Sequence, residues 1–406
     1  MISISTTQAL AGDKVTKKVQ ELIDSSQSSV TDSSKAFSYA QSAIDEAEKS
    51  KSNISIAAAM YNMARTFKYH DRYSYTIVYF DFAIEAYENA GEQLKVAEVL
   101  RQAGRIYYAM GHYDKAMTYY MNGLKIYDDL NVVNADKGWL LRYIGSVFKH
   151  KENYDKALYY YKKAYEIFEN TNNQDGMSSS YNNIGIVYGI KGRDSLEIFY
   201  YRKALKVAQD GGAKNRESVI LNNIGSALTK HHKYAEAMTY FEEVFDYLSE
   251  LDEPNYMKLG DTYKNFAKLY YETDKLDLAL ENLKLSELNV RKTEKKQKIE
   301  LAEIYELYSK LYVKKGDYKK AYEYRLLYND LQKLLGDASV AAEIEKIQFR
   351  YEREQFEEKI NQEREKENAA SSSQRQWLIY LSIGIVLLTL ALVVQKIKFS
   401  RALRNK

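Results

Sequence analysis

The sequence predicts an all-α protein built from tandem pairs of antiparallel helices. Three observations support this class. Small residues recur about every 40 residues along most of the chain, a second small residue usually follows twelve positions later, and the 406 residues include a single proline. A fixed period of this size is typical of repeat architectures. The scarcity of proline permits long, uninterrupted helices.

The repeat is clearest in residues 142–168, where Gly145 is followed by Phe148, Ala157 and Tyr161. Glycine and alanine leave room where two helices approach each other, so Gly145 and Ala157 are expected at a close helix crossing. Phe148 and Tyr161 are expected to fill the space around that crossing.

The same pattern extends over most of the chain. About 17 residues per helix plus short turns account for the period of about 40. A poorer first helix is expected near residues 13–26, before a second helix that contains Ala36, Ala40 and Ala43. The small residues that mark the first helices are Ala64, Gly104, Gly145, Gly185, Gly225, Ala267 and Ser309. The residues twelve positions later are Thr76, Ala116, Ala157, Glu197, Ala237, Ala279 and Ala321.

Glu197 departs from this pattern, because it stands where a small apolar residue should pack against Gly185. Asp194 likewise replaces the tyrosine that begins several second helices. Burying an unpaired carboxylate costs several kcal/mol. A local change of register at residues 193–196 is therefore the favoured interpretation, and a functional irregularity is the alternative.

These repeats resemble the tetratricopeptide repeat, in a form of about 40 residues rather than 34. The resemblance covers residues 13–330, with seven clear units and one partial unit. It implies an α-solenoid, a right-handed superhelix of helix pairs, with a concave groove lined mainly by the first helix of each pair. The proline usual near the end of each repeat is missing, so a more continuous linkage between units is expected.

The composition and motifs favour binding over catalysis. The net charge of +3 gives no electrostatic case for direct nucleic-acid binding. Cysteine is absent from the sequence, and no phosphate-binding, dinucleotide, metalloprotease or nucleophile motif occurs. His231 and His232 have no carboxylates at a metal-ligand spacing along the sequence. We therefore predict no enzyme activity, cofactor or metal site.

The tetratricopeptide resemblance also implies which side chains face the groove. Positions three before, one after and four after each small residue are expected there, and basic residues at them suit an acidic peptide or a terminal carboxylate. The alternative is that these are solvated charges balanced by neighbours such as Glu98 and Asp261. The basic residues are Arg65, Lys68, Arg101, Arg105, Arg142, Lys149, Lys264 and Lys268. Asparagines two positions before the small residue are predicted to hold a ligand's backbone or to bridge repeats: Asn62, Asn183, Asn223 and Asn265.

After residue 330 the repeat stops. Residues 331–370 are predicted to form a charged helical stalk or coiled coil, which is a candidate for homodimerisation, and residues 371–376 a polar linker. Residues 377–394 carry no charge and span about 27 Å as a helix, close to the thickness of the hydrocarbon core. We predict a transmembrane helix there, followed by a basic tail at 395–406.

Two observations on topology conflict. The tail has five basic residues and no acid, which favours a cytoplasmic tail and an external or periplasmic repeat domain. However, residues 1–12 show no complete signal peptide, although Ala9-Leu10-Ala11 resembles a cleavage site. Residues 1–12 are therefore either an ordinary N-terminus or the remnant of a signal peptide whose start lies upstream. A tail-anchored protein with cytoplasmic repeats is the alternative.

The order of repeats, charged helix and membrane helix resembles membrane-bound tetratricopeptide signalling proteins of Bacteroidetes-type bacteria. In that family a histidine kinase or a helix-turn-helix domain follows the membrane helix, whereas only a short tail follows it here. The first hypothesis is a membrane-anchored module that binds proteins or peptides as a sensor or scaffold. The second is the truncated sensor half of a histidine kinase or of a helix-turn-helix regulator.

Overall fold

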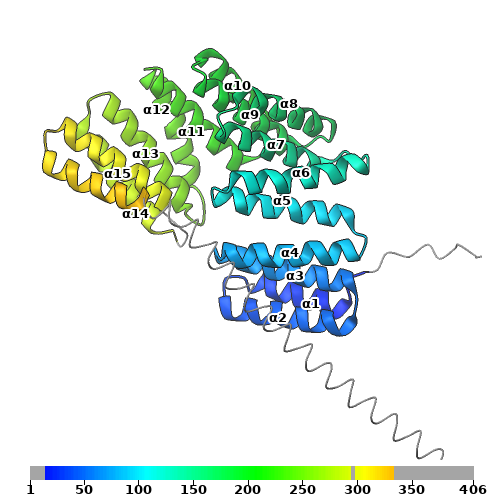
Figure 1. Cartoon of the computed structure of the whole chain (residues 1–406). Helices are drawn as coiled ribbons and strands as arrows, with labels where there is room; N and C mark the ends of the chain where they lie inside the picture. Colours follow the sequence, from blue (N-terminus) through cyan, green and yellow to red (C-terminus); the bar gives the residue numbers. More distant parts are fainter. Residues whose placement is uncertain (1–13, 294–297, 333–406) are drawn as a thin grey trace, which may run out of the picture. The chain divides into compact units, whose positions relative to one another are not determined.

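A computed structural model describes residues 14–293 and 298–332, and in these residues every regular element is an α-helix (Figure 1). The predicted all-α class is therefore confirmed for this part of the chain. The helices are α1 (Lys17–Ser28), α2 (Ser33–Ser50), α3 (Asn53–Tyr69), α4 (Tyr73–Asn89), α5 (Gln93–Ala109), α6 (Tyr113–Asp129), α7 (Ala135–His150), α8 (Tyr154–Asn170), α9 (Gln174–Ile190), α10 (Asp194–Asp210), α11 (Lys214–Lys230), α12 (Tyr234–Ser249), α13 (Tyr256–Glu272), α14 (Leu276–Arg291) and α15 (Lys298–Lys314); a further helical segment covers 318–332.

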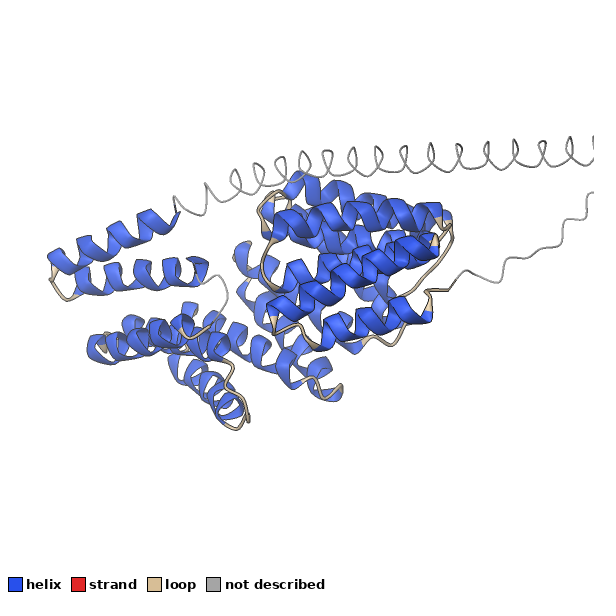
Figure 2. Cartoon of the chain, turned by 90° about the horizontal axis from the view of Figure 1, so that it is seen from below, coloured by secondary structure: helices blue, strands red, loops and turns tan. Residues whose placement is uncertain are grey.

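Odd-numbered helices are the first helices of the repeats and even-numbered helices are the second. Each packs against the next in chain order, as the stacked pairs in Figure 2 show. From α3 to α14 every helix has 16 or 17 residues, as the period requires. The predicted stalk, linker, transmembrane helix, basic tail and N-terminal segment lie outside the described residues.

Short turns separate the helices both within and between repeats. Residues 90–92 connect two repeats and residues 110–112 connect the two helices of one, so this junction is as tight as a turn within a repeat. The connections at 130–134 and 250–255 are longer. Each of these turns contains a glycine in the left-handed region, Gly91 or Gly111, where glycine avoids the Cβ clash. These two turns therefore reverse the chain without proline, whereas the connection between α12 and α13 contains Pro254.

A glycine and an aromatic ring meet at the crossing inside the central helix pairs. A Cβ added to Gly145 of α7 would lie 2.8 Å from ring carbons of Tyr161 in α8 and 3.2 Å from the Ala157 carbonyl oxygen. Tyr161 is fully buried. Burial raises its pKa to about 12, so its hydroxyl stays protonated, and it donates a hydrogen bond to Ser146 Oγ at 3.1 Å. The equivalent pairs are Gly104 with Tyr120, Gly185 with Tyr201, and Gly225 with Phe241.

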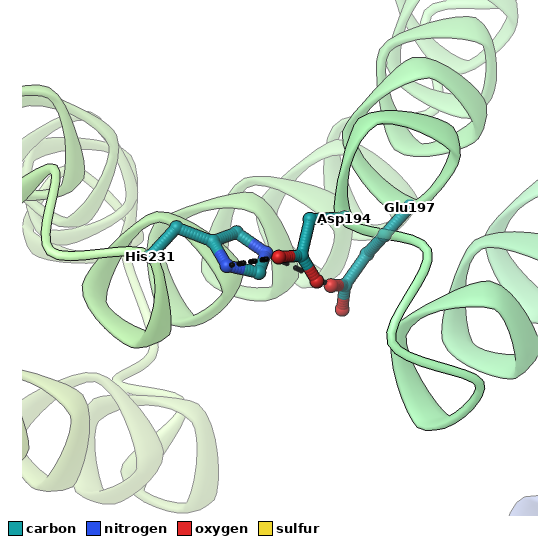
Figure 3. Close-up of side chains that lie close together, drawn as sticks. All are labelled: Asp194, Glu197 and His231. Atoms are coloured by element: carbon teal, nitrogen blue, oxygen red, sulfur yellow. Dashed lines mark hydrogen bonds and ion pairs between the residues drawn. The ribbon is translucent and has the colours of Figure 1, made fainter.

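Glu197 keeps the register of the repeat, so the predicted change of register at residues 193–196 is wrong. Its carbonyl oxygen lies 3.3 Å from a Cβ added to Gly185. The Ala157 carbonyl oxygen lies in the same way 3.2 Å from a Cβ added to Gly145. Its buried carboxylate extends beside Gly189, where an added Cβ would lie only 2.1 Å from Glu197 Oε1. His231 Nε2 lies 3.2 Å from Glu197 Oε2 (Figure 3), and the Lys230 ammonium lies 3.8 Å from the same oxygen.

Ion pairs connect the first helices of consecutive repeats. Arg101 of α5 donates to Asp136 of α7 at 2.9 Å. Lys264 of α13 is buried and donates to Asp261 at 3.0 Å and to Glu303 of α15 at 2.6 Å. The prediction that such groove cations are balanced by acidic neighbours, Asp261 among them, matches this geometry. The Arg101–Asp136 and Lys264–Glu303 pairs therefore fix the spacing between two repeats.

We predict that Gly145→Ala destabilises the chain by about 1–2 kcal/mol. The methyl group would press on the fully buried Tyr161 ring, and overpacking of this kind costs about 1–3 kcal/mol, partly offset by about 1 kcal/mol of helix propensity. Gly123→Ala is the matched control, because its Cβ would come no closer than 3.3 Å to Leu140. Urea unfolding should show a lower midpoint for Gly145→Ala alone. Equal midpoints in both variants would contradict a tight crossing.

We further predict that Glu303→Gln lowers stability by about 1 kcal/mol at neutral pH, with the loss disappearing in acid. Burial raises the pKa of Glu303, but the Lys264 ammonium outweighs burial and leaves the pKa below its ordinary value. A lowered carboxylate pKa stabilises the fold above the unfolded pKa, and this contribution is lost as pH falls through the folded pKa.

Thermal melts from pH 7 to pH 3 should therefore converge for Glu303→Gln and the unchanged chain. Glu166→Gln is the control, because Glu166 pairs with Lys163 in the same helix on an exposed surface. A constant difference between Glu303→Gln and the unchanged chain at every pH would show that the pair does not titrate as argued.

Candidate binding site

The predicted basic residues of the N-terminal half come together along the first helices α3, α5 and α7. Gln102 Oε1 accepts from Lys68 Nζ at 3.3 Å and from Arg105 Nη1 at 3.2 Å. The Arg105 guanidinium lies 5.6 Å from the centre of the Tyr143 ring, and that of Arg142 lies 4.4 Å from the same centre. Lys68, Arg105 and Arg142 thus belong to one surface, and the aromatic partner Tyr143 was not predicted.

The other predicted basic residues in this half, Arg101, Lys149 and Arg65, differ in how freely their side chains could contact a ligand. Arg101 is committed to Asp136 and is mostly buried, so it serves the junction between repeats more than a ligand. Burial, together with the Arg142 guanidinium, lowers the pKa of Lys149. Arg65 is exposed to solvent.

The predicted asparagines bridge neighbouring first helices. Asn223 Nδ2 of α11 donates to Asn182 Oδ1 of α9 at 2.8 Å, and Asn265 Nδ2 of α13 donates to Asn222 Oδ1 at 3.2 Å. Asn183 Nδ2 is buried and has no partner among the described residues. The prediction named one residue of each Asn-Asn pair; the doubled asparagines at 182–183 and 222–223 were a signal that both residues matter.

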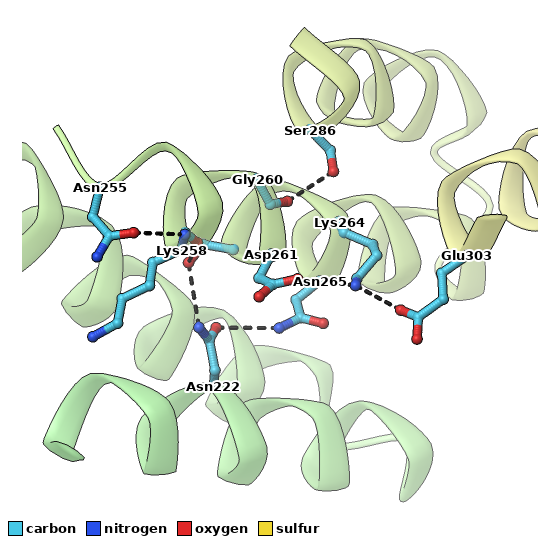
Figure 4. Close-up of polar contacts among 10 residues, drawn as sticks. Asn222, Asn255, Lys258, Gly260, Asp261, Lys264, Asn265, Ser286 and Glu303 are labelled. Atoms are coloured by element: carbon cyan, nitrogen blue, oxygen red, sulfur yellow. Dashed lines mark hydrogen bonds and ion pairs between the residues drawn. The ribbon is translucent and has the colours of Figure 1, made fainter. Parts of the chain in front are cut away.

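A hollow of about 240 Å³ lies between α11, α13 and α15. Figure 4 shows the polar contacts at this place, with Asn222 reaching from α11 toward Asn265 of α13, and Lys264 reaching toward Glu303 of α15. The hollow is lined by Ser218, Val219, Asn222, Asn223, Ser226, Lys258, Asp261, Lys264, Asn265, Lys268 and Glu303. Two predicted lysines, Lys264 and Lys268, and two predicted asparagines, Asn223 and Asn265, therefore share one cavity.

The lysines of this hollow differ electrostatically. Burial lowers the pKa of Lys264, but the Asp261 and Glu303 carboxylates outweigh burial and raise it above its ordinary value. Desolvation within the hollow and repulsion by Lys264 lower the pKa of Lys268. Lys258 bonds to Asn215 and Ser218, and burial followed by the Arg216 charge lowers its pKa. A carboxylate placed near Lys268 would relieve the repulsion that this residue experiences.

The hollow offers the chemistry that extended peptides need. A carboxamide has two donor and two acceptor positions, so the one hydrogen bond that Asn265 makes among the described residues, to Asn222, leaves capacity for a peptide N–H or C=O. An ammonium group such as that of Lys268 accepts no hydrogen bond, but it can donate charge-assisted hydrogen bonds to a carboxylate. Together these groups suit a backbone and one acidic group.

The predicted transmembrane helix at 377–394 is not tested by this geometry. Among residues 14–293 and 298–332, no helix is both long enough and apolar enough to cross a membrane.

Comparison with known protein families identifies repeats in the same part of the chain where the structure shows helix pairs. Two family models, both described as tetratricopeptide repeat, match residues 97–129, 136–210 and 216–287. No curated protein sequence matches the chain significantly.

Several solved structures share the fold at low sequence identity. Aspartyl phosphate phosphatase F from Bacillus subtilis is 17% identical, with a TM-score of 0.57 over 71% of this chain and 73% of its own. The Rap conjugation gene regulator of the plasmid pLS20, in complex with the Phr* peptide, is 15% identical, with a TM-score of 0.55 over 78% and 96%. A tetratricopeptide repeat protein from Parabacteroides merdae is 17% identical, with a TM-score of 0.52 over 73% and 99%.

The matched family models cover repeats in which the structure places glycine, alanine and aromatic residues at the crossings that define the helix pair. The structural neighbours add the same fold over most of their own length. Residues 97–129, 136–210 and 216–287 are therefore tetratricopeptide repeats, and such repeats indicate a module for protein–protein interaction.

Proposed function

We propose that this protein binds an extended, acidic peptide segment of a partner protein in the hollow between α11, α13 and α15. The proposal rests on the row of asparagines across α9, α11 and α13, which lies beside Lys264 and Lys268. Asn222, Asn223 and Asn265 would hold the peptide backbone, and Lys268 would hold an acidic side chain or the terminal carboxylate.

The charge distribution supports an acidic ligand of modest affinity. Lys264 is already paired with two carboxylates, so Lys268 supplies the main unbalanced attraction in the hollow. Lys268 is partly solvated, so the attraction is screened by salt. The second basic surface, around Tyr143, would extend the contact to a longer ligand through Lys68, Arg105 and Arg142.

The structural neighbour solved with a bound peptide supports the same reading, as a likeness of fold. Another neighbour is an aspartyl phosphate phosphatase. We propose binding as the function of this chain, because the residues that gather here are amides and ammonium groups suited to holding a ligand.

We also propose that the module is anchored in a membrane by residues 377–394 and acts as a sensor or scaffold in signal transduction. The uncharged apolar run of 18 residues supports the anchor, and the five basic residues after it favour a cytoplasmic tail with external repeats. The charged segment 331–370 between the repeats and the anchor would transmit a signal or join two copies of the chain. The sensor half of a kinase or of a helix-turn-helix regulator is the alternative.

We predict that Lys268→Glu weakens binding of acidic peptides about fivefold at low salt, because a partly exposed charge contributes about 1 kcal/mol. The peptides are first selected from a random display library on the full-length chain. Affinity is then measured by fluorescence anisotropy at two ionic strengths. Lys162→Glu, with the same charge change on exposed α8, is the control and should leave affinity unchanged. Equal loss in both variants would indicate a general charge effect and remove the hollow as the site.

We predict that the repeats of the expressed chain lie outside the cytoplasm. Protease added to intact spheroplasts should digest the repeat region, since the positive-inside bias places the basic tail in the cytoplasm. A cytoplasmic marker protein that stays intact is the control. Repeats that resist protease until the cells are lysed would assign them to the cytoplasm.

A further inference from the structure

The junction between α10 and α11 is built differently from comparable junctions in the described chain. In three other places a lysine six positions after the small residue pairs with an aspartate of the preceding repeat: Lys151 with Asp114, Lys191 with Asp155, and Lys315 with Asp277. At the α10–α11 junction the equivalent position is His231, and it meets two carboxylates, Asp194 and Glu197.

The three side chains converge at one place, as Figure 3 shows. His231 Nδ1 lies 3.2 Å from Asp194 Oδ2, and His231 Nε2 lies 3.2 Å from Glu197 Oε2. One donor atom from each residue lies within 4.8 Å of the donor atoms of the other two. The Glu197 side chain is 9% exposed and that of His231 is 14% exposed, whereas Asp194 is open to solvent.

Three departures from the repeat build this cluster. Asp194 replaces the tyrosine that begins α8, Glu197 replaces the alanine at the crossing, and Gly189 stands where α7 has Lys149. Gly189 supplies the room for the carboxylate, because an added Cβ there would lie 2.1 Å from Glu197 Oε1. A buried carboxylate in an alanine position is costly unless positive charge is provided beside it.

We propose that Asp194, Glu197 and His231 form a binding site for a divalent transition-metal ion of the Zn²⁺ or Co²⁺ class. One imidazole nitrogen and two carboxylate oxygens are a donor set suited to such ions, whereas Ca²⁺ and Mg²⁺ prefer oxygen alone. Ligand bonds of about 2.0–2.1 Å in a tetrahedron separate two donor atoms by about 3.3 Å, close to the distance between His231 Nε2 and Glu197 Oε2.

The surroundings decide how the ion would be held. Asp194 is exposed, so its carboxylate can turn toward the shared position without disturbing the core. Lys230 Nζ lies 3.8 Å from Glu197 Oε2 and donates to the Gly189 carbonyl at 3.0 Å. The lysine competes with the ion for Glu197, and the ion would connect two consecutive repeats more firmly than the lysine–aspartate pairs do elsewhere.

The test uses the purified full-length chain, free of any histidine tag and stripped with a chelator. The sequence has no cysteine and five histidines, so few other ligands compete. Titration with Co²⁺, followed by visible absorption, and with Zn²⁺, followed by calorimetry, should show one saturable site. His231→Gln should abolish that site, and Asp194→Asn should weaken it.

The matched control is His70→Gln. His70 stands at the position equivalent to His231 in an earlier repeat, six residues after Ala64, where its ring contacts Phe37 and Tyr69. This variant should bind the ion as the unchanged chain does. His231→Lys separates a structural role from metal binding, because lysine restores the pairing used at the other junctions: it should keep the melting temperature and lose the metal site.

Three results would overturn the proposal. These are the absence of saturable Zn²⁺ and Co²⁺ binding by the unchanged chain, metal binding that survives in both His231→Gln and His231→Lys, or equal loss of binding in His70→Gln. Because none of these measurements involves a peptide, their failure is independent of the peptide-binding proposal.

Discussion

Inside the central helix pairs, a glycine backbone lies against an aromatic ring of the partner helix, and this contact sets how close the two helices come. Gly145 and Tyr161 show it most clearly, with no room for a Cβ between them. Because the interior of a protein is close-packed, the ring and the missing side chain form one fitted unit. The 16- to 17-residue helices, their short turns and the stacking of one pair on the next are consistent with this crossing.

The same crossing accounts for some of the 39 tyrosines. Tyr120, Tyr161 and Tyr201 fill the place that is filled by Phe241 in the following repeat. A tyrosine at this place carries a hydroxyl. When the hydroxyl is buried, it needs a hydrogen-bond partner, and its burial without one destabilises the fold. Tyr161 finds Ser146, whereas Tyr120 has a buried hydroxyl without a partner among the described residues. The apolar ring, more than its hydroxyl, is what the crossing requires.

Polar side chains on the first helices serve two purposes at once. Asn222, Asn223 and Asn265 hold neighbouring repeats together, and they also line the hollow with the lysines. Lys264 is bound between two carboxylates and mainly fixes α13 against α15, while Lys268 beside it remains partly solvated. Residues that the sequence pattern treats alike therefore differ, because Lys264 is held in ion pairs whereas Lys268 is exposed in the hollow.

The sequence by itself determined the all-α class, the helix length and the residues at the crossings, because these follow from a local period that repeats many times. It also indicated Lys264, Lys268, Asn183 and Asn223 as residues of the first helices. It could not decide which cations are already paired, since Asp136 and Glu303 come from the next repeat. Nor could it show that Glu197 keeps its register, because the room beside Gly189 and the His231 imidazole next to the carboxylate are supplied across helices. Periodicity fixes what each repeat contains, whereas charge balance depends on which side chains of neighbouring repeats meet, and only the tertiary structure decides that.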